Sequence, residues 1–116
     1  MRSWRFPIAR VAAGAWLAAL TWGSLAPQDS VQGAFAFGDI LVHIGGYLGL
    51  TLLLLAAQRH PRLLITLGVS MGIGVVMELL QMLTSDRSGS LVDIASNALG
   101  AGIAVLIWLI GRRLTS

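Results

Sequence analysis

Apolar residues dominate long segments of this chain, and polar residues gather between the segments or near their ends. The apolar segments cover residues 9–26, 39–57, 63–83 and 91–111. Each is close to the roughly 20 residues that a helix needs to cross a hydrocarbon layer about 30 Å thick. Because backbone groups in lipid must pair within their own segment, the pattern predicts four membrane-spanning helices.

The composition favours a membrane protein over a soluble helical bundle. Of the 116 residues, 56% are hydrophobic and 11% are charged, whereas about a quarter of the residues in soluble domains are charged. A soluble bundle of this size needs a polar outer surface, and the chain has too few polar residues to supply one. We therefore expect an all-α membrane protein with a single domain over residues 1–116. The lipid bilayer is its first expected partner.

The lengths of the links and the positions of arginine predict the topology. Short links join antiparallel neighbours, so we expect an up-down bundle. Seven of the eight basic residues lie before or at the beginning of the first segment, between the second and third, or after the fourth. They are Arg2, Arg5, Arg10, Arg59, Arg62, Arg112 and Arg113. These places share one side of the bundle, and the positive-inside rule predicts that this side, with both termini, is cytoplasmic.

Two other interpretations of these basic and apolar residues are disfavoured. The net charge is only +3, without the clustered basic patch of a nucleic-acid-binding protein, so we expect no nucleic-acid partner. The first segment also resembles a cleavable signal peptide, with Ser24 and Ala26 before a candidate cleavage site. Pro27 directly after that site disfavours cleavage, so we expect the segment to remain as an anchor.

Polar side chains occur near the outer ends of the last three segments. Residues four apart lie on the same face of a helix, one turn from each other. The side chains are Asp39, His43 and Tyr47 on the second segment, Glu78 and Gln81 on the third, and Asp93 and Asn97 on the fourth. We expect them to form a polar layer that ends where the second segment continues as LTLLLLAA.

Small residues are expected to let the helices approach closely enough for these polar groups to pair. The candidates are Gly45, Gly49, Gly68, Gly72, Ala95, Ala98 and Gly102.

The polar layer has two interpretations. Hydrogen bonds between membrane helices often serve assembly alone. Ionisable side chains inside membrane segments are rare, however, and commonly mark functional sites. We expect His43 beside Asp39 to be a proton acceptor. The planar guanidinium of Arg87, the remaining basic residue, suits a carboxylate or a phosphate.

Several motifs together resemble a known family. They are SLAP at 24–27, DILVHIGGYLGL at 39–50, ELLQ at 78–81 and RSGSLVDIASNALGAGIA at 87–104. In this order they resemble the VanZ-like family of small bacterial membrane proteins. The resemblance implies a multi-pass protein of the bacterial cytoplasmic (inner) membrane with a role in the cell envelope. The family's namesake is associated with resistance to teicoplanin-type glycopeptides, so antibiotic resistance is one implied role.

Three classes of function remain open. The first is a non-catalytic protein that binds a lipid headgroup, a lipid-linked cell-wall precursor or an envelope protein. The second is an intramembrane acid/base enzyme acting on a lipid-linked substrate. The third, a proton-coupled carrier, is disfavoured because the inner half of the bundle lacks ionisable residues. The candidate ligand-binding residues are Tyr47, Gln81, Arg87 and Asn97, and the candidate catalytic residues are His43, Asp39, Glu78 and Asp93.

The sequence predicts neither a cofactor nor a metal. It contains no cysteine and no dedicated metal-binding motif, so thiolate sites are excluded. An enzyme of the second class could nevertheless gather Asp39, His43, Glu78 and Asp93 around a divalent ion.

Overall fold

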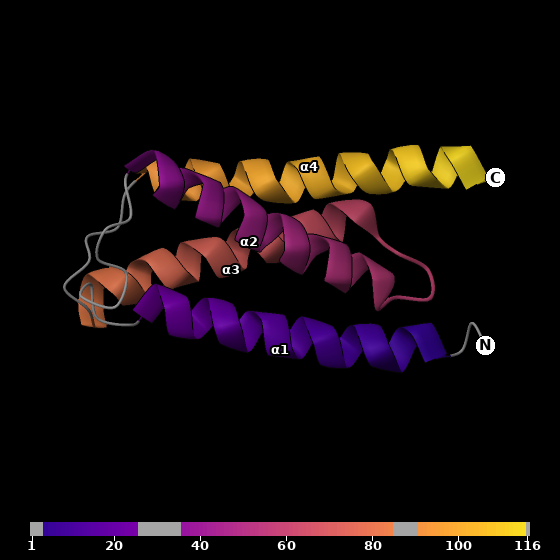
Figure 1. The fold of residues 1–116 in the computed structure, drawn as a ribbon, viewed down its shortest axis with the longest axis horizontal. Helices are drawn as coiled ribbons and strands as arrows, with labels where there is room; N and C mark the ends of the chain where they lie inside the picture. The colour runs from indigo at the N-terminus through magenta and orange to yellow at the C-terminus, as the bar shows by residue number, and fades with distance from the viewer. Residues whose placement is uncertain (1–3, 26–35, 85–90, 116) are drawn as a thin grey trace.

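The computed structural model describes residues 4–25, 36–84 and 91–115, with the side chains of residues 36–39 and 84 left out. These residues form four helices and no strand (Figure 1). The helices are α1 (Arg5–Leu25), α2 (Ala36–Ala56), α3 (Leu63–Thr84) and α4 (Leu91–Thr115). The predicted all-α fold with four helices is therefore confirmed, and each helix lies within a few residues of its predicted segment.

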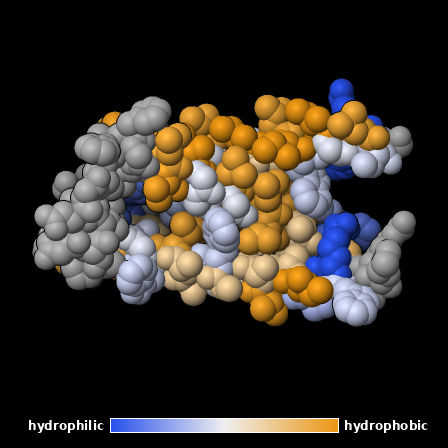
Figure 2. Space-filling view, in the orientation of Figure 1, coloured by the Kyte–Doolittle hydropathy of each residue, from blue (hydrophilic) through white to orange (hydrophobic). Residues whose placement is uncertain are grey.

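The outer surface of the bundle is apolar. Helices α1, α3 and α4 are each long and apolar enough to cross a membrane, and the Ile40–Ala56 part of α2 is a shorter apolar helix. Large apolar side chains such as Val11, Leu64 and Leu106 are exposed, and Figure 2 shows hydrophobic residues along the top and through the middle of the coloured part of this face. An exposed apolar surface of this extent is suited to a lipid bilayer.

Arginine side chains connect the beginning of α1 to the end of α2. Arg5 Nε donates to Ala56 O at 3.4 Å and Arg10 Nε donates to Ala57 O at 3.2 Å. The last carbonyl groups of a helix have no partner inside the helix, and basic side chains stabilise that negative end. The beginning of α1 and the end of α4 lie at the same end of the bundle in Figure 1, so this end is rich in arginine.

Glycines set the spacing between the helices. A Cβ atom on Gly100 of α4 would overlap the carbonyl oxygen of Ile44 and lie 3.0 Å from its carbonyl carbon. A Cβ atom on Gly49 would lie 2.5 Å from the ring of Trp16. Trp16 Nε1 also donates to Gly46 O at 2.8 Å, which connects α1 to α2. The backbones therefore approach closely where a side chain is missing, as in other membrane bundles.

A buried hydroxyl pair connects α2 to α3. Thr51 Oγ1 donates to Tyr47 O at 2.7 Å and is hydrogen-bonded to Ser70 Oγ at 2.8 Å. Both side chains are fully buried.

We expect Thr51→Val to lower the free energy of unfolding by about 0.5–1.5 kcal/mol, because the change leaves Ser70 without this partner at nearly constant side-chain volume. Unfolding in mixed detergent and SDS, followed by far-UV circular dichroism, measures the change. Thr115→Val is the control, since Thr115 is exposed near the end of α4. Equal destabilisation by both variants would contradict the assignment.

Candidate functional site

Three helices bring one ionisable side chain each to a common point. His43 from α2, Glu78 from α3 and Asp93 from α4 each offer a nitrogen or carboxylate oxygen, and these atoms all lie within 4.8 Å of one another. His43 is 9% exposed and Glu78 is 2% exposed, while Asp93 is partly buried. We call these three residues the polar cluster. Such groups are costly to bury in an apolar environment, so their convergence requires an explanation.

Two side chains of α4 lie next to the imidazole of His43, one near each ring nitrogen. His43 Nδ1 lies 2.7 Å from Asn97 Oδ1, and His43 Nε2 lies 3.7 Å from Asp93 Oδ1. An amide oxygen only accepts hydrogen bonds, so Nδ1 carries the hydrogen and donates it. In the neutral ring, the lone pair of Nε2 is then directed toward the side of Asp93.

Local helix geometry explains how Asn97 and Asp93 reach the same ring. They lie one turn apart on the same face of α4, as their four-residue spacing predicts. Gly74 of α3 packs directly on Asn97, because a Cβ atom there would lie 3.0 Å from Asn97 Nδ2 and 3.2 Å from Asn97 Cβ. The amide is thus enclosed between helices, which limits its rotation.

Tyr47 lies one turn along α2 from His43 and is 2% exposed. Tyr47 Oη is buried without a hydrogen-bond partner among the described residues, and the same holds for Asn97 Nδ2. Buried polar atoms are nearly always hydrogen-bonded in proteins, so these two atoms mark a place where a bound group would gain partners.

The remaining candidate residues have different positions. Gln81 is buried, and its Nε2 donates to Ser24 O at 2.7 Å, near the end of α1. This contact connects α3 to α1. Arg87 lies outside the described residues, as does the side chain of Asp39. The structure therefore brings together His43, Tyr47, Glu78, Asp93 and Asn97, with Gln81 bonded to a neighbouring helix.

The polar contacts extend further along α2 than expected. Thr51 follows Tyr47 by four residues, and its bond to Ser70 continues the polar side of α2 into the LTLLLLAA stretch. The expectation that the layer ends before this stretch was therefore wrong. The continuing four-residue spacing from His43 through Tyr47 to Thr51 was the available sequence signal.

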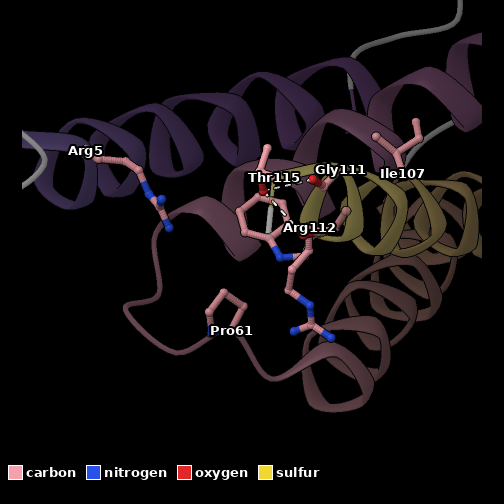
Figure 3. Close-up of a pocket in the computed structure, with 7 residues that line it drawn as sticks. Arg5, Pro61, Ile107, Gly111, Arg112 and Thr115 are labelled. Atoms are coloured by element: carbon pink, nitrogen blue, oxygen red, sulfur yellow. Dashed lines mark hydrogen bonds between the residues drawn. The ribbon is translucent and has the colours of Figure 1, made fainter.

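The arginine-rich end of the bundle carries open grooves. One has a volume of about 560 Å³ and is lined by Arg5, Pro61, Ile107, Trp108, Gly111, Arg112 and Thr115 (Figure 3). Another, of about 650 Å³, combines Arg10, Arg59 and Arg62 with apolar residues such as Ile65 and Val69. In membrane proteins, basic side chains beside an apolar surface commonly bind the headgroups of anionic lipids.

Comparison with known proteins gives a family assignment. The family described as VanZ/LLP1 matches residues 7–112, which is nearly the whole chain. No curated protein and no solved structure matches the chain.

Proposed function

The chain belongs to the VanZ-like family, and we propose that it binds a lipid-linked component of the cell envelope through the buried polar cluster. In this proposal the helices run alternately up and down through the bacterial cytoplasmic membrane as one domain. Both termini are cytoplasmic. The arginines at the beginning of α1 and the end of α4 support this orientation through the positive-inside rule, and the polar cluster then belongs to the outer half of the bundle.

The convergence of His43, Glu78 and Asp93 from three helices is the observation that carries the proposal. Helix assembly alone does not require ionisable groups, because hydroxyl pairs such as Thr51 and Ser70 supply interhelical hydrogen bonds at lower cost. A ligand with phosphate or sugar groups would accept hydrogen bonds from the buried donors Tyr47 Oη and Asn97 Nδ2. Arg87 is the proposed partner of an anionic group on that ligand.

Acid/base catalysis on the same lipid-linked substrate is the second candidate function. It is favoured by the fixed orientation of His43, whose Nδ1 is bonded to Asn97 and whose Nε2 faces Asp93. A general base needs such an orientation within hydrogen-bonding reach of its substrate. In this case His43 would be the general base, oriented by Asp39, and Glu78 or Asp93 would be the general acid.

Lipid analysis of the purified protein tests the proposal. We expect the wild-type protein, extracted in mild detergent, to retain a lipid-linked envelope precursor. We expect His43→Ala and Glu78→Gln each to reduce that lipid by about 10-fold to 100-fold, because each removes an ionisable group of the polar cluster, and a hydrogen bond that involves a charged group contributes about 1.5–3 kcal/mol. Membrane abundance should stay unchanged.

His60→Ala is the matched control, because His60 is exposed at the other end of the bundle. Equal lipid content in all the variants would refute the binding role. Conversion of the retained lipid by the wild-type protein, lost in His43→Ala, would establish the enzyme instead. Teicoplanin susceptibility of cells expressing the protein is the first phenotype to assay.

A further inference from the structure

We propose that His43, Glu78 and Asp93 bind one divalent transition-metal ion of the Zn²⁺ or Mn²⁺ type between α2, α3 and α4. The proposal rests on the proposed function, because the ion would occupy the same polar cluster. The Thr51–Ser70 pair and the arginine-lined grooves lack the combination of an imidazole and carboxylates that such an ion needs.

The ligand atoms of the polar cluster are close enough together for one ion. One imidazole nitrogen and two carboxylate oxygens lie within 4.8 Å of one another. Zinc binds such atoms at about 2.0–2.2 Å, so two ligands of one ion lie about 3–4 Å apart. Movements of about an ångström would bring the ligand atoms from their present separations to this spacing. Rotation about the side-chain bonds of Glu and Asp allows movements of this size.

His43 is oriented as metal-binding histidines usually are. A metal-binding histidine nearly always donates its other ring N–H to a carbonyl or carboxylate oxygen, which fixes the tautomer. His43 Nδ1 meets this condition through Asn97 Oδ1 at 2.7 Å. Nε2 then offers its lone pair on the side of Asp93, 3.7 Å away. Asn97 is therefore a positioning residue for the metal ligand.

The buried donor Tyr47 is an independent observation that points to a bound group. Tyr47 is 2% exposed, and its Oη is without a hydrogen-bond partner among the described residues. Tyr47 lies one turn from His43 on α2. A water molecule on the ion, or a metal-bound carboxylate oxygen, would accept this hydrogen.

The ligand set indicates the class of ion. An imidazole with two carboxylates suits Zn²⁺, Mn²⁺ or Fe²⁺, whereas Ca²⁺ takes 6–8 oxygen ligands and Mg²⁺ keeps several waters. Two nearby carboxylates in a low-dielectric environment also repel each other when both are ionised. A divalent cation between the two carboxylates replaces this repulsion by attraction. Because the carboxylates are close together only in the folded bundle, the cation should bind the bundle more tightly than the unfolded chain.

Metal content of the full-length protein tests the proposal. Protein in detergent is stripped with EDTA, given Zn²⁺ or Mn²⁺ alone, desalted and analysed by elemental mass spectrometry. We expect about one ion per chain in the wild-type protein. H43Q, E78Q and D93N should each weaken binding by at least tenfold, a lower limit taken from the 10–100-fold cost of losing an outer-shell partner. H60Q is the matched control and should bind as the wild type does; equal binding in H43Q and H60Q would overturn the proposal.

A measurement on the wild-type protein alone keeps the proposal testable if a variant fails to fold. Co²⁺ held in a protein site with fewer than six ligands absorbs visible light more strongly than hydrated Co²⁺, and one equivalent of Zn²⁺ should remove this additional absorption. Absence of the absorption would overturn the metal site. Retention of the lipid by metal-free protein would leave the proposed function standing, whereas metal binding without any lipid would leave only the metal site.

Discussion

Gly100→Ala is expected to destabilise the bundle by about 3 kcal/mol or more, at the upper end of the range for overpacked cores. The added Cβ atom would overlap the carbonyl oxygen of Ile44 and lie 3.0 Å and 3.1 Å from its carbonyl carbon and Cα. These are backbone atoms, so the strain cannot be relieved by rotating a side chain. Helices α2 and α4 would have to separate, which also moves His43 away from Asn97 and Asp93.

Unfolding of the purified protein in SDS, monitored by circular dichroism, measures this loss of stability. The amount of folded protein in membranes is a second measurement. Gly102→Ala on the same helix is the matched control, because a Cβ atom there meets no described atom within 4 Å. We expect Gly102→Ala to be neutral or slightly stabilising, since alanine is the better helix former. Similar midpoints for the two variants would show that α2 and α4 are not in backbone contact at Gly100.

Asn97→Leu is expected to release His43 and to lower the free energy of unfolding by about 1–3 kcal/mol. The substitution removes the oxygen that accepts the Nδ1 hydrogen at 2.7 Å, and a buried donor without a partner carries a penalty of this size. The loss of this outer partner should also weaken Zn²⁺ binding about 10-fold to 100-fold. Nitrogen-15 spectra of the imidazole report the tautomer, which we expect to be Nδ1-protonated in the wild type and mixed in the variant.

Asn97→Asp separates the positioning role from simple packing. It keeps an acceptor oxygen in the same position, so we expect His43 to retain the Nδ1-protonated tautomer. If Asn97→Leu instead left the tautomer and the Zn²⁺ affinity unchanged while lowering stability, Asn97 would act only in packing.

Much of the candidate site could be predicted because helical spacing is a local property. Asp93 and Asn97 were expected on one face of α4, and both reach His43 in the structure. The partners of His43 were harder to predict, because spacing within α2 suggests only Asp39. Contacts to another helix depend on how each helix is rotated about its axis, and the spacing within one segment carries no information about that rotation.

The glycines show the same limit. Gly45, Gly68, Gly72 and Gly102 were expected at the helix contacts, yet a Cβ atom on each would meet no described atom within 4 Å. The close approaches instead involve Gly46, Gly74 and Gly100, together with the expected Gly49. Adjacent positions such as Gly45 and Gly46 differ by about 100° around a helix. The choice between them is therefore made by packing.

The sequence by itself determined the four helices, their apolar exterior and the polar residues available to the site, because segment length, hydrophobicity and helical period are encoded locally. Only the tertiary structure decided that His43 meets Asn97 and Asp93, that Glu78 joins them and that Gly100 sets the distance between α2 and α4. The physical reason is close packing. The rotation of each helix about its axis depends on which of its small residues and costly polar groups pack against a neighbour, and that balance depends on all four helices at once.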